Sequence, residues 1–302
     1  MTNSSPDAGV PITHVTVSAP AKINLVLRIL DRRPDGYHNL WSLMQTVKLE
    51  DELSISINSS HSIINLRCDD PSLKTDRSNL VSRAAAAVLE ESGQTVGLDI
   101  VLTKRIPMGA GLGGGSSDAA ATIMGLNRIL GLRWSKELIA QVGQTLGSDV
   151  PFFSFAPSAT VAGRGERVTP VRIMDSRWVV LVNPGFPIET KWAYQQLSES
   201  RSGVAPVSRS HLALETSPEL TWKQVLERAE NDFEVPVFKA YPLLRDIKQQ
   251  LISQGAEVAL LSGSGATIFG VFSTEARARS AQAFFLNEQT FKVFVAETCS
   301  GS

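Results

Sequence analysis

The chain has 302 residues, enough for two domains, and 43% of them are hydrophobic, so it can bury a substantial core. Its 29 Lys and Arg nearly balance 30 Asp and Glu, and the net charge of −1 gives no overall field that would attract nucleic acid or an acidic membrane. With only two cysteines, Cys68 and Cys299, the chain has neither a disulfide framework nor a Cys-x-x-Cys metal site.

The sequence also predicts no membrane partner. No apolar run approaches the ~20 residues of a membrane span. The polar segment Met1 to Gly9 lacks the basic and apolar regions of a signal peptide. We therefore expect a cytoplasmic protein.

Short β-branched runs dominate the first hundred residues. They predict strands over residues 13–19, 23–29, 45–49, 53–57, 63–67 and 98–106, with a turn at Asp35-Gly36. Ser78 is expected to cap a helix that ends at Gly93, because the apolar residues between them recur at helical spacing.

A glycine-rich loop follows the last of these strands. Behind it, small residues predict a helix over 119–130, and Ser135 is expected to cap a second helix that stops at Gly147. The loop therefore opens a pair of helices and not a strand–helix–strand unit.

The second half alternates strands and helices. The patterns predict strands over 178–183, 257–261, 266–272 and 291–296, and helices over 190–197, 221–229, 239–254 and 274–287. The serine-rich segment Ser198 to Leu220 is expected to be a mobile surface connection. Leaving one helix aside, the order is the β-α-β-β-α-β of a ferredoxin-like domain. We place a domain boundary near residue 175, give or take ten.

The glycine-rich loop has the composition of a phosphate site. Five of the seven residues from Gly109 to Gly115 are glycine. Without Cβ atoms their N–H groups can surround a ligand, and the N-terminus of the next helix adds partial positive charge. Ser116 and Ser117 place hydroxyls where a phosphate oxygen or its Mg2+ would bind. A tight turn without a ligand is the weaker alternative.

The loop lacks features of the two common nucleotide-binding motifs, and this limits the kind of nucleotide site it can form. The spacing Gly109-x-Gly111-x-x-Gly114 matches the dinucleotide fingerprint, but that fingerprint needs a second strand with an acidic residue ~20 positions later, and here a helix follows the helix. No Lys-Ser or Lys-Thr closes the run as in a P-loop. The loop predicts a third kind of nucleotide site.

Three motifs resemble those of the galactokinase, homoserine kinase, mevalonate kinase and phosphomevalonate kinase superfamily. They are Ala19–Leu25, Pro107–Asp118 and Leu261–Ala266. Within it, Asp35–Leu40, the stretched glycine loop and Gly147–Phe153 resemble the 4-diphosphocytidyl-2-C-methyl-D-erythritol kinase family. The resemblance covers roughly residues 12 to 298 in order.

This resemblance implies a two-domain α+β fold with the catalytic site in the cleft between the domains. Residues 1–175 would form an ATP-binding domain like the second domain of ribosomal protein S5, and 176–302 the ferredoxin-like domain. The implied reaction moves the γ-phosphoryl group of ATP, with Mg2+, to the 2-hydroxyl of a cytidine diphosphate-linked methylerythritol, on the methylerythritol phosphate route to isoprenoid precursors. The chain would act on this small molecule as a monomer or weak homodimer.

By the same resemblance, two residues carry the chemistry. Asp149 would be the base that accepts the hydroxyl proton, and Lys22 beside it would stabilise the oxygen that develops charge. The ATP phosphates would be held by the loop residues Pro107, Met108, Gly109, Ala110, Gly111, Leu112, Gly113, Gly114, Gly115, Ser116 and Ser117. The metal ligand stays open, and so does the contact of Asp118, where the family more often has Asn.

Four further residues are expected to bind the acceptor. Asn24 would contact it near Lys22. The resemblance implies that Tyr37 and Phe186 sandwich the cytosine, and an aromatic face can stack on such a flat base. His38 would read the edge of the base by hydrogen bonds. For the tyrosine–histidine pair and for Phe186, ordinary packing is the alternative.

Three other functions are kept as alternatives. A mevalonate- or homoserine-type kinase follows if Tyr37 and His38 read no base. A nucleic-acid-binding module shares the N-terminal fold type, but the chain lacks a basic stripe laced with aromatics. A nicotinamide-dependent oxidoreductase would use the glycine fingerprint.

Overall fold

A computed structural model describes residues 13–60, 62–201, 203, 206–217 and 219–300. The segment Met1 to Gly9, predicted to carry no signal pattern, and four positions of the 198–220 connection lie outside these residues. In the part of the chain that is described, no helix has both the length and the apolar character to cross a bilayer.

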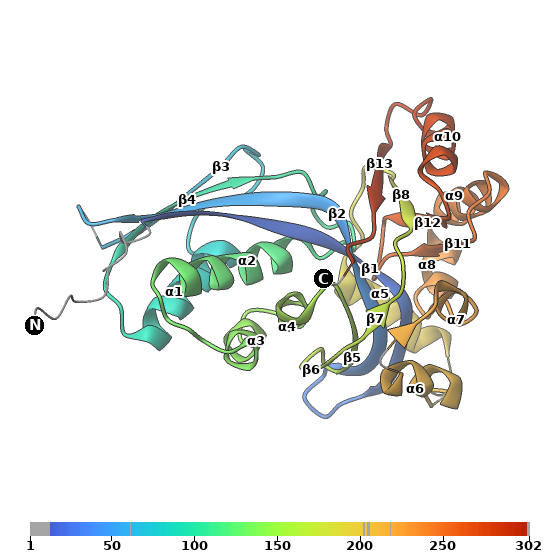
Figure 1. Cartoon of the computed structure of the whole chain (residues 1–302). Coiled ribbons are helices and arrows are strands. Elements are labelled where there is room, and N and C mark those ends of the chain that lie inside the picture. The colour runs from blue at the N-terminus through green and yellow to red at the C-terminus, as the bar shows by residue number, and fades with distance from the viewer. Residues whose placement is uncertain (1–12, 61, 202, 204–205, 218, 301–302) are drawn as a thin grey trace, which may run out of the picture.

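Two long antiparallel strands, β1 (His14–Arg32) and β2 (His38–Asn58), form the main body of the first half (Figure 1). The sequence pattern predicted two shorter strands in place of each, which is wrong. The register shifts at places such as Pro20/Ala21, so bulges carry the pairing through the breaks in the pattern. β2 pairs with β5 (Ser158–Gly163) along its first half and with β4 (Gly97–Thr103) along its second.

Short strands extend this sheet and connect it to the second half. β3 (Ile64–Cys68) pairs with β4, β6 (Arg167–Pro170) with β5, and β10 (Glu230–Asn231) runs parallel to β1 at the other edge. Apart from the sheet, β7 (Arg172–Ile173) pairs with β9 (Glu219–Leu220). β10 comes from the second half of the sequence, so the first sheet contains strands from both sides of residue 175. The domain boundary near residue 175 therefore stays a prediction.

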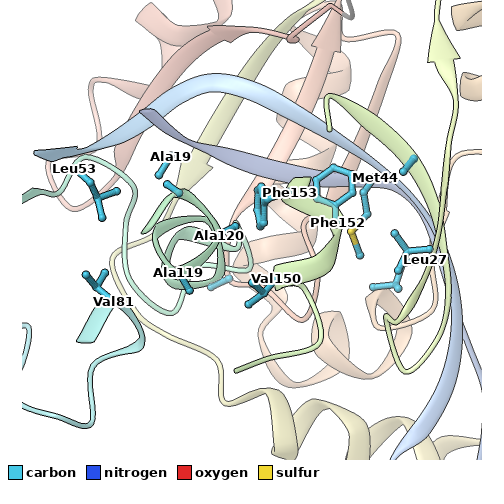
Figure 2. Packing of buried hydrophobic residues seen from close by; sticks show 14 of the residues in the cluster. Ala19, Leu27, Met44, Leu53, Val81, Ala119, Ala120, Val150, Phe152 and Phe153 are labelled. Atoms are coloured by element: carbon cyan, nitrogen blue, oxygen red, sulfur yellow. The ribbon is translucent and has the colours of Figure 1, made fainter. Parts of the chain in front are cut away.

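Four helices lie against one face of the long sheet: α1 (Leu80–Ser92), α2 (Gly114–Ile129), α3 (Lys136–Gln144) and α4 (Val150–Phe155) (Figure 1). Ala119 and Ala120 of α2 share a buried cluster with Ala19 of β1 and Phe152 of α4 (Figure 2). Small side chains let α2 approach the sheet closely. This packing fixes the start of α2, where the glycine-rich loop ends.

The helix ends differ from the predicted ones for local reasons. Asn79 and not Ser78 caps α1: its side chain accepts from the N–H of Val81 at 2.8 Å, whereas Ser78 donates to Asp76. α2 begins at Gly114, because the last glycines and serines of the loop are already helical. Ser135 caps α3 as predicted, but α3 ends at Gln144, and α4 was not expected.

The second sheet confirms the ferredoxin-like order. Its strands are β8 (Trp178–Asn183), β11 (Val258–Leu261), β12 (Ile268–Phe272) and β13 (Lys292–Glu297), all antiparallel in the order β11-β12-β8-β13. The remaining helix before the last strand is α10 (Glu275–Phe285). The fold is α+β, as predicted.

The serine-rich connection is more regular than expected. α5 (Thr190–Ser200) runs into it, and α6 (Arg209–Thr216) lies within it, with His211 and Leu214 buried. Beyond it come α7 (Trp222–Leu226), α8 (Glu234–Ala240) and α9 (Pro242–Ser253). The predicted helix over 239–254 is split because Pro242 fits only the first turn of a helix.

Candidate active site

A cavity of about 670 Å³ brings the separated motifs together. Its wall includes Lys22 and Asn24 from β1, the residues from Pro107 to Ser116, Asp149 just before α4, Tyr194 from α5 and Gly263 to Gly265 after β11. Two further segments line the cavity as well, Ser72 to Lys74 and Ser78 to Leu80. The cavity lies where elements from both halves of the chain meet.

The glycine-rich loop needs its glycines for two reasons. Gly109, Gly111 and Gly113 have φ of +61°, +76° and +71°, a region that other residues rarely adopt. An added Cβ on Gly111 would lie 2.0 Å from the carbonyl oxygen of Ser262, and one on Gly113 would lie 2.9 Å from Lys22 Cγ. The loop therefore touches both the Lys22 stem and the segment after β11.

A lysine and a carboxylate meet at the cavity wall. Lys22 Nζ lies 3.4 Å from Asp149 Oδ2 and donates to Asn24 Oδ1 at 2.7 Å. Asn24 in turn donates to Ser42 Oγ at 2.9 Å. The Lys22 side chain is 5% exposed and that of Asp149 is 32% exposed, so the cation is fixed while the carboxylate opens to the cavity.

A second buried ion cluster lies beside the loop, and its Lys104 and Asp118 also line the cavity. Lys104 pairs with Asp51 and, at 2.8 Å, with Asp118. Burial raises the pKa of Asp118 to about 7, although the charge of Lys104 opposes the rise. The Asp51 carboxylate also accepts the backbone N–H of Ile106 at 2.9 Å. The contact of Asp118 that the sequence left open is thus Lys104.

Tyr37 and His38 lie at the start of β2. The Tyr37 ring is 53% exposed and has the Arg164 guanidinium 4.1 Å from its centre. His38 stacks on Tyr194 at 4.8 Å, with Ser198 Oγ 3.3 Å from its Nε2. Burial lowers the pKa of His38, and nearby arginine charges lower it further. The imidazole is therefore neutral near pH 7, able to donate one hydrogen bond and accept another.

Phe186 lies elsewhere. Its ring stacks on Tyr241 at 5.5 Å, in a cluster that also holds Trp192, and it is not among the residues that line the cavity. Tyr37 and His38 are likewise not among the lining residues, so the sandwich of Phe186 with Tyr37 stays a prediction. Tyr194, which stacks on His38, does line the cavity, as does Phe233.

Comparisons with known proteins place the chain in a family. Residues 79–156 match the GHMP kinases N terminal domain, and residues 214–289 match the GHMP kinases C terminal domain. A 4-diphosphocytidyl-2-C-methyl-D-erythritol kinase from Syntrophotalea carbinolica is 43% identical over 279 residues, which cover 92% of this chain and 97% of that one. One from Geobacter metallireducens is 40% identical over 282 residues, which cover 92% and 96%. The chain belongs to the 4-diphosphocytidyl-2-C-methyl-D-erythritol kinase family.

Solved structures agree with membership of this kinase family. A crystal structure of 4-(cytidine 5′-diphospho)-2C-methyl-D-erythritol kinase matches with a TM-score of 0.77 at 32% identity, covering 95% of this chain and all of that one (100%). A homoserine kinase from Cytophaga hutchinsonii matches with a TM-score of 0.75 at 18% identity, covering 99% and 98%, and shows the shared fold alone. The family relatives at 43% and 32% identity thus make the chain a kinase, as the sequence predicted.

The sequence analysis did not single out Tyr194, an aromatic residue of α5 that lines the cavity of this kinase. Burial raises the pKa of its phenol, and the Asp149 carboxylate raises it further, so the hydroxyl stays protonated. Tyr194 therefore lies near Asp149 as well as His38. Its position on a short amphipathic helix gave no signal, because only the tertiary fold brings α5 to the cavity.

Proposed function

We propose that this kinase transfers the γ-phosphoryl group of ATP to the 2-hydroxyl of 4-diphosphocytidyl-2-C-methyl-D-erythritol. The observation that carries the proposal is the Lys22–Asp149 pair, 3.4 Å apart, on the wall of the cavity that the glycine-rich loop also lines. Phosphoryl transfer asks a protein chiefly for alignment and for stabilisation of charge. The cavity supplies groups for both.

The two catalytic residues act on the acceptor hydroxyl. Asp149, open to the cavity, takes its proton as the oxygen attacks phosphorus. Lys22, fixed by Asn24, pairs with this carboxylate and stabilises the charge that develops on the attacking oxygen and the transferred group. Asn24 thereby positions Lys22, and it lines the cavity near the acceptor.

The ATP phosphates lie along the loop from Pro107 to Ser117, at the N-terminus of α2. The left-handed glycines turn backbone N–H groups toward the ligand, and the helix end favours negative charge. Beyond the loop, the cavity reaches apolar side chains such as Leu73, Leu80 and Met108. These accommodate the nucleoside end of ATP.

The residues present also fit Mg2+. Magnesium usually binds through one or two protein oxygens together with substrate phosphates. The described residues contain no group of three His, Cys, Asp or Glu that could hold a metal without such phosphates. Ser116 lines the cavity; Ser117 does not, and its Oγ is buried with no hydrogen-bond partner among the described residues. The Ser116 hydroxyl would hold Mg2+, which would neutralise phosphate charge when bound.

The base of the acceptor lies by Tyr37, His38 and Tyr194. The neutral His38 imidazole offers a donor and an acceptor to the edge of cytosine. In this arrangement Tyr194 replaces Phe186 as the second aromatic residue, because it stacks on His38 and lines the cavity.

Replacing Tyr194 by alanine is expected to raise the KM of the acceptor by roughly 5- to 100-fold, since base–aromatic stacking is worth about 1–3 kcal/mol. The KM of ATP should stay within about twofold. Phe186→Ala is the matched control and should leave the acceptor KM nearly unchanged. Steady-state kinetics with each substrate varied decide the matter: a larger effect from Phe186→Ala restores the sandwich predicted from sequence.

Gly111→Ala is expected to lower thermal stability and raise the KM of ATP, because the new Cβ must displace the loop from Ser262. Gly131→Ala is the control: its φ of +62° imposes similar strain, but nothing lies within 4 Å of an added Cβ. The Gly111 variant should lose about 1 kcal/mol more in the free energy of unfolding. If both variants lose the same free energy of unfolding and the KM for ATP is unchanged, the close approach of Gly111 to Ser262 is unimportant.

The proposed activity is tested by coupled ADP release. The purified kinase is supplied with Mg-ATP and, in separate reactions, 4-diphosphocytidyl-2-C-methyl-D-erythritol, mevalonate and homoserine. We expect turnover with the cytidylated compound alone. Faster release with mevalonate or homoserine would favour the other superfamily activities. The cytoplasmic location and the monomeric or weakly dimeric state stay predictions.

A further inference from the structure

The turn between β5 and β6 carries a cation that the proposed chemistry has not used. An added Cβ on Gly165 would lie 2.2 Å from the carbonyl oxygen of Ser148, so the turn packs directly against the residue before Asp149. Next to it, Arg164 extends over the exposed ring of Tyr37. Arg164 is not among the residues that line the cavity, but its neighbour Gly165 touches the catalytic segment and its own guanidinium touches Tyr37.

The Arg164 side chain has donor capacity to spare. Its guanidinium is 4.1 Å from the centre of the Tyr37 ring, and its Nε is buried with no hydrogen-bond partner among the described residues. The nearby carboxylates hydrogen-bond to other groups, although Arg164 also acts electrostatically on Asp35. Asp35 accepts from Arg33 Nε at 3.1 Å and from the N–H of Tyr37 at 3.2 Å, while Glu166 accepts the backbone N–H of Arg164 at 2.6 Å.

An unpaired buried donor is costly, and a guanidinium presents its donors in a fork that matches phosphate oxygens. The acceptor proposed above carries a diphosphate between its base and its reacting alcohol. We propose that Arg164 binds this diphosphate while its guanidinium stays stacked on Tyr37. The inference rests on the proposed function and adds a specificity-determining residue to it: Arg164 distinguishes a nucleoside diphosphate conjugate from an uncharged nucleoside or a free polyol.

The test compares two probes, CDP and cytidine, by titration calorimetry with a non-hydrolysable ATP analogue occupying the donor site. Arg164→Met should weaken CDP binding by about 10- to 100-fold, the usual worth of charge-assisted hydrogen bonds. Cytidine binding should stay within about threefold. Arg164→Lys keeps the charge without the fork and should give an intermediate loss for CDP. The exposed Arg167 of the same hairpin supplies the control, and Arg167→Met should change neither affinity.

Each outcome decides a separate question. If Arg164→Met weakens CDP and cytidine equally, Arg164 only supports the Tyr37 ring, and the inference is overturned. Unchanged CDP affinity overturns it as well. If the unaltered kinase binds neither probe, base recognition itself fails, and the proposed function falls with the inference. Thermal unfolding of both Arg164 variants checks that they fold, and the lysine variant keeps the test decisive if the methionine variant does not.

Discussion

Asp149→Asn is expected to lower kcat by roughly 10² to 10⁴, the usual contribution of a general base. The amide keeps the size of the carboxylate and its place before α4, but it cannot take the proton of the acceptor hydroxyl. The KM of ATP should change little, because the phosphates are assigned to the loop and not to Asp149. Steady-state rates at saturating acceptor measure the effect.

A matched control separates catalysis from general charge loss. Asp246→Asn removes a carboxylate from the exposed face of α9, where Asp246 is 55% exposed beside Arg245. This variant should keep full activity. A rate for Asp149→Asn within about threefold of the unaltered kinase would show that another group removes the proton.

Lys22→Met is expected to reduce kcat by at least about 100-fold, since a fixed donor aimed at developing charge is typically worth ~3 kcal/mol. Methionine fills the space of the buried lysine stem, so the loop at Gly113 keeps its contact. Lys136→Met, on the exposed first turn of α3, is the control and should be silent. A small effect on kcat with a large effect on stability would make Lys22 a structural residue.

The pair should also behave as a unit. Because Lys22 and Asp149 lie 3.4 Å apart, the two substitutions share one interaction, and their effects on kcat should not add. The double variant should be nearly as active as the weaker single variant. Full additivity in the logarithm of kcat would mean that the two side chains act independently.

The sequence indicates a phosphate site because the signal for one is local. Glycines in the left-handed region, two hydroxyls and a helix start are consecutive in the chain, so Gly109 to Ser117 could be assigned from composition. The meeting of Lys22 with Asp149 could not, because the two lie far apart in sequence. That pairing came from the family resemblance, and the geometry of the cavity supports it.

The errors have a common physical cause. The predicted break in β1 falls at residues 20–22, where Pro20 interrupts the β-branched pattern and the polar Lys22 faces the cavity. Tyr194 was not singled out beside Phe186 for a similar reason. Both are aromatic residues close in sequence, and only the packing of α5 against His38 decides which of them reaches the cavity.

The central claim concerns where the phosphoryl group goes. The kinase, Mg-ATP and the cytidylated methylerythritol are incubated, and the product is examined by ³¹P NMR. A tertiary alcohol has no hydrogen on its carbinol carbon, so the account predicts a new phosphomonoester signal without splitting by such a hydrogen. One ADP should form for each product, and Asp149→Asn should slow the growth of the signal by roughly 10² to 10⁴. A split signal, or inorganic phosphate alone, would contradict the account.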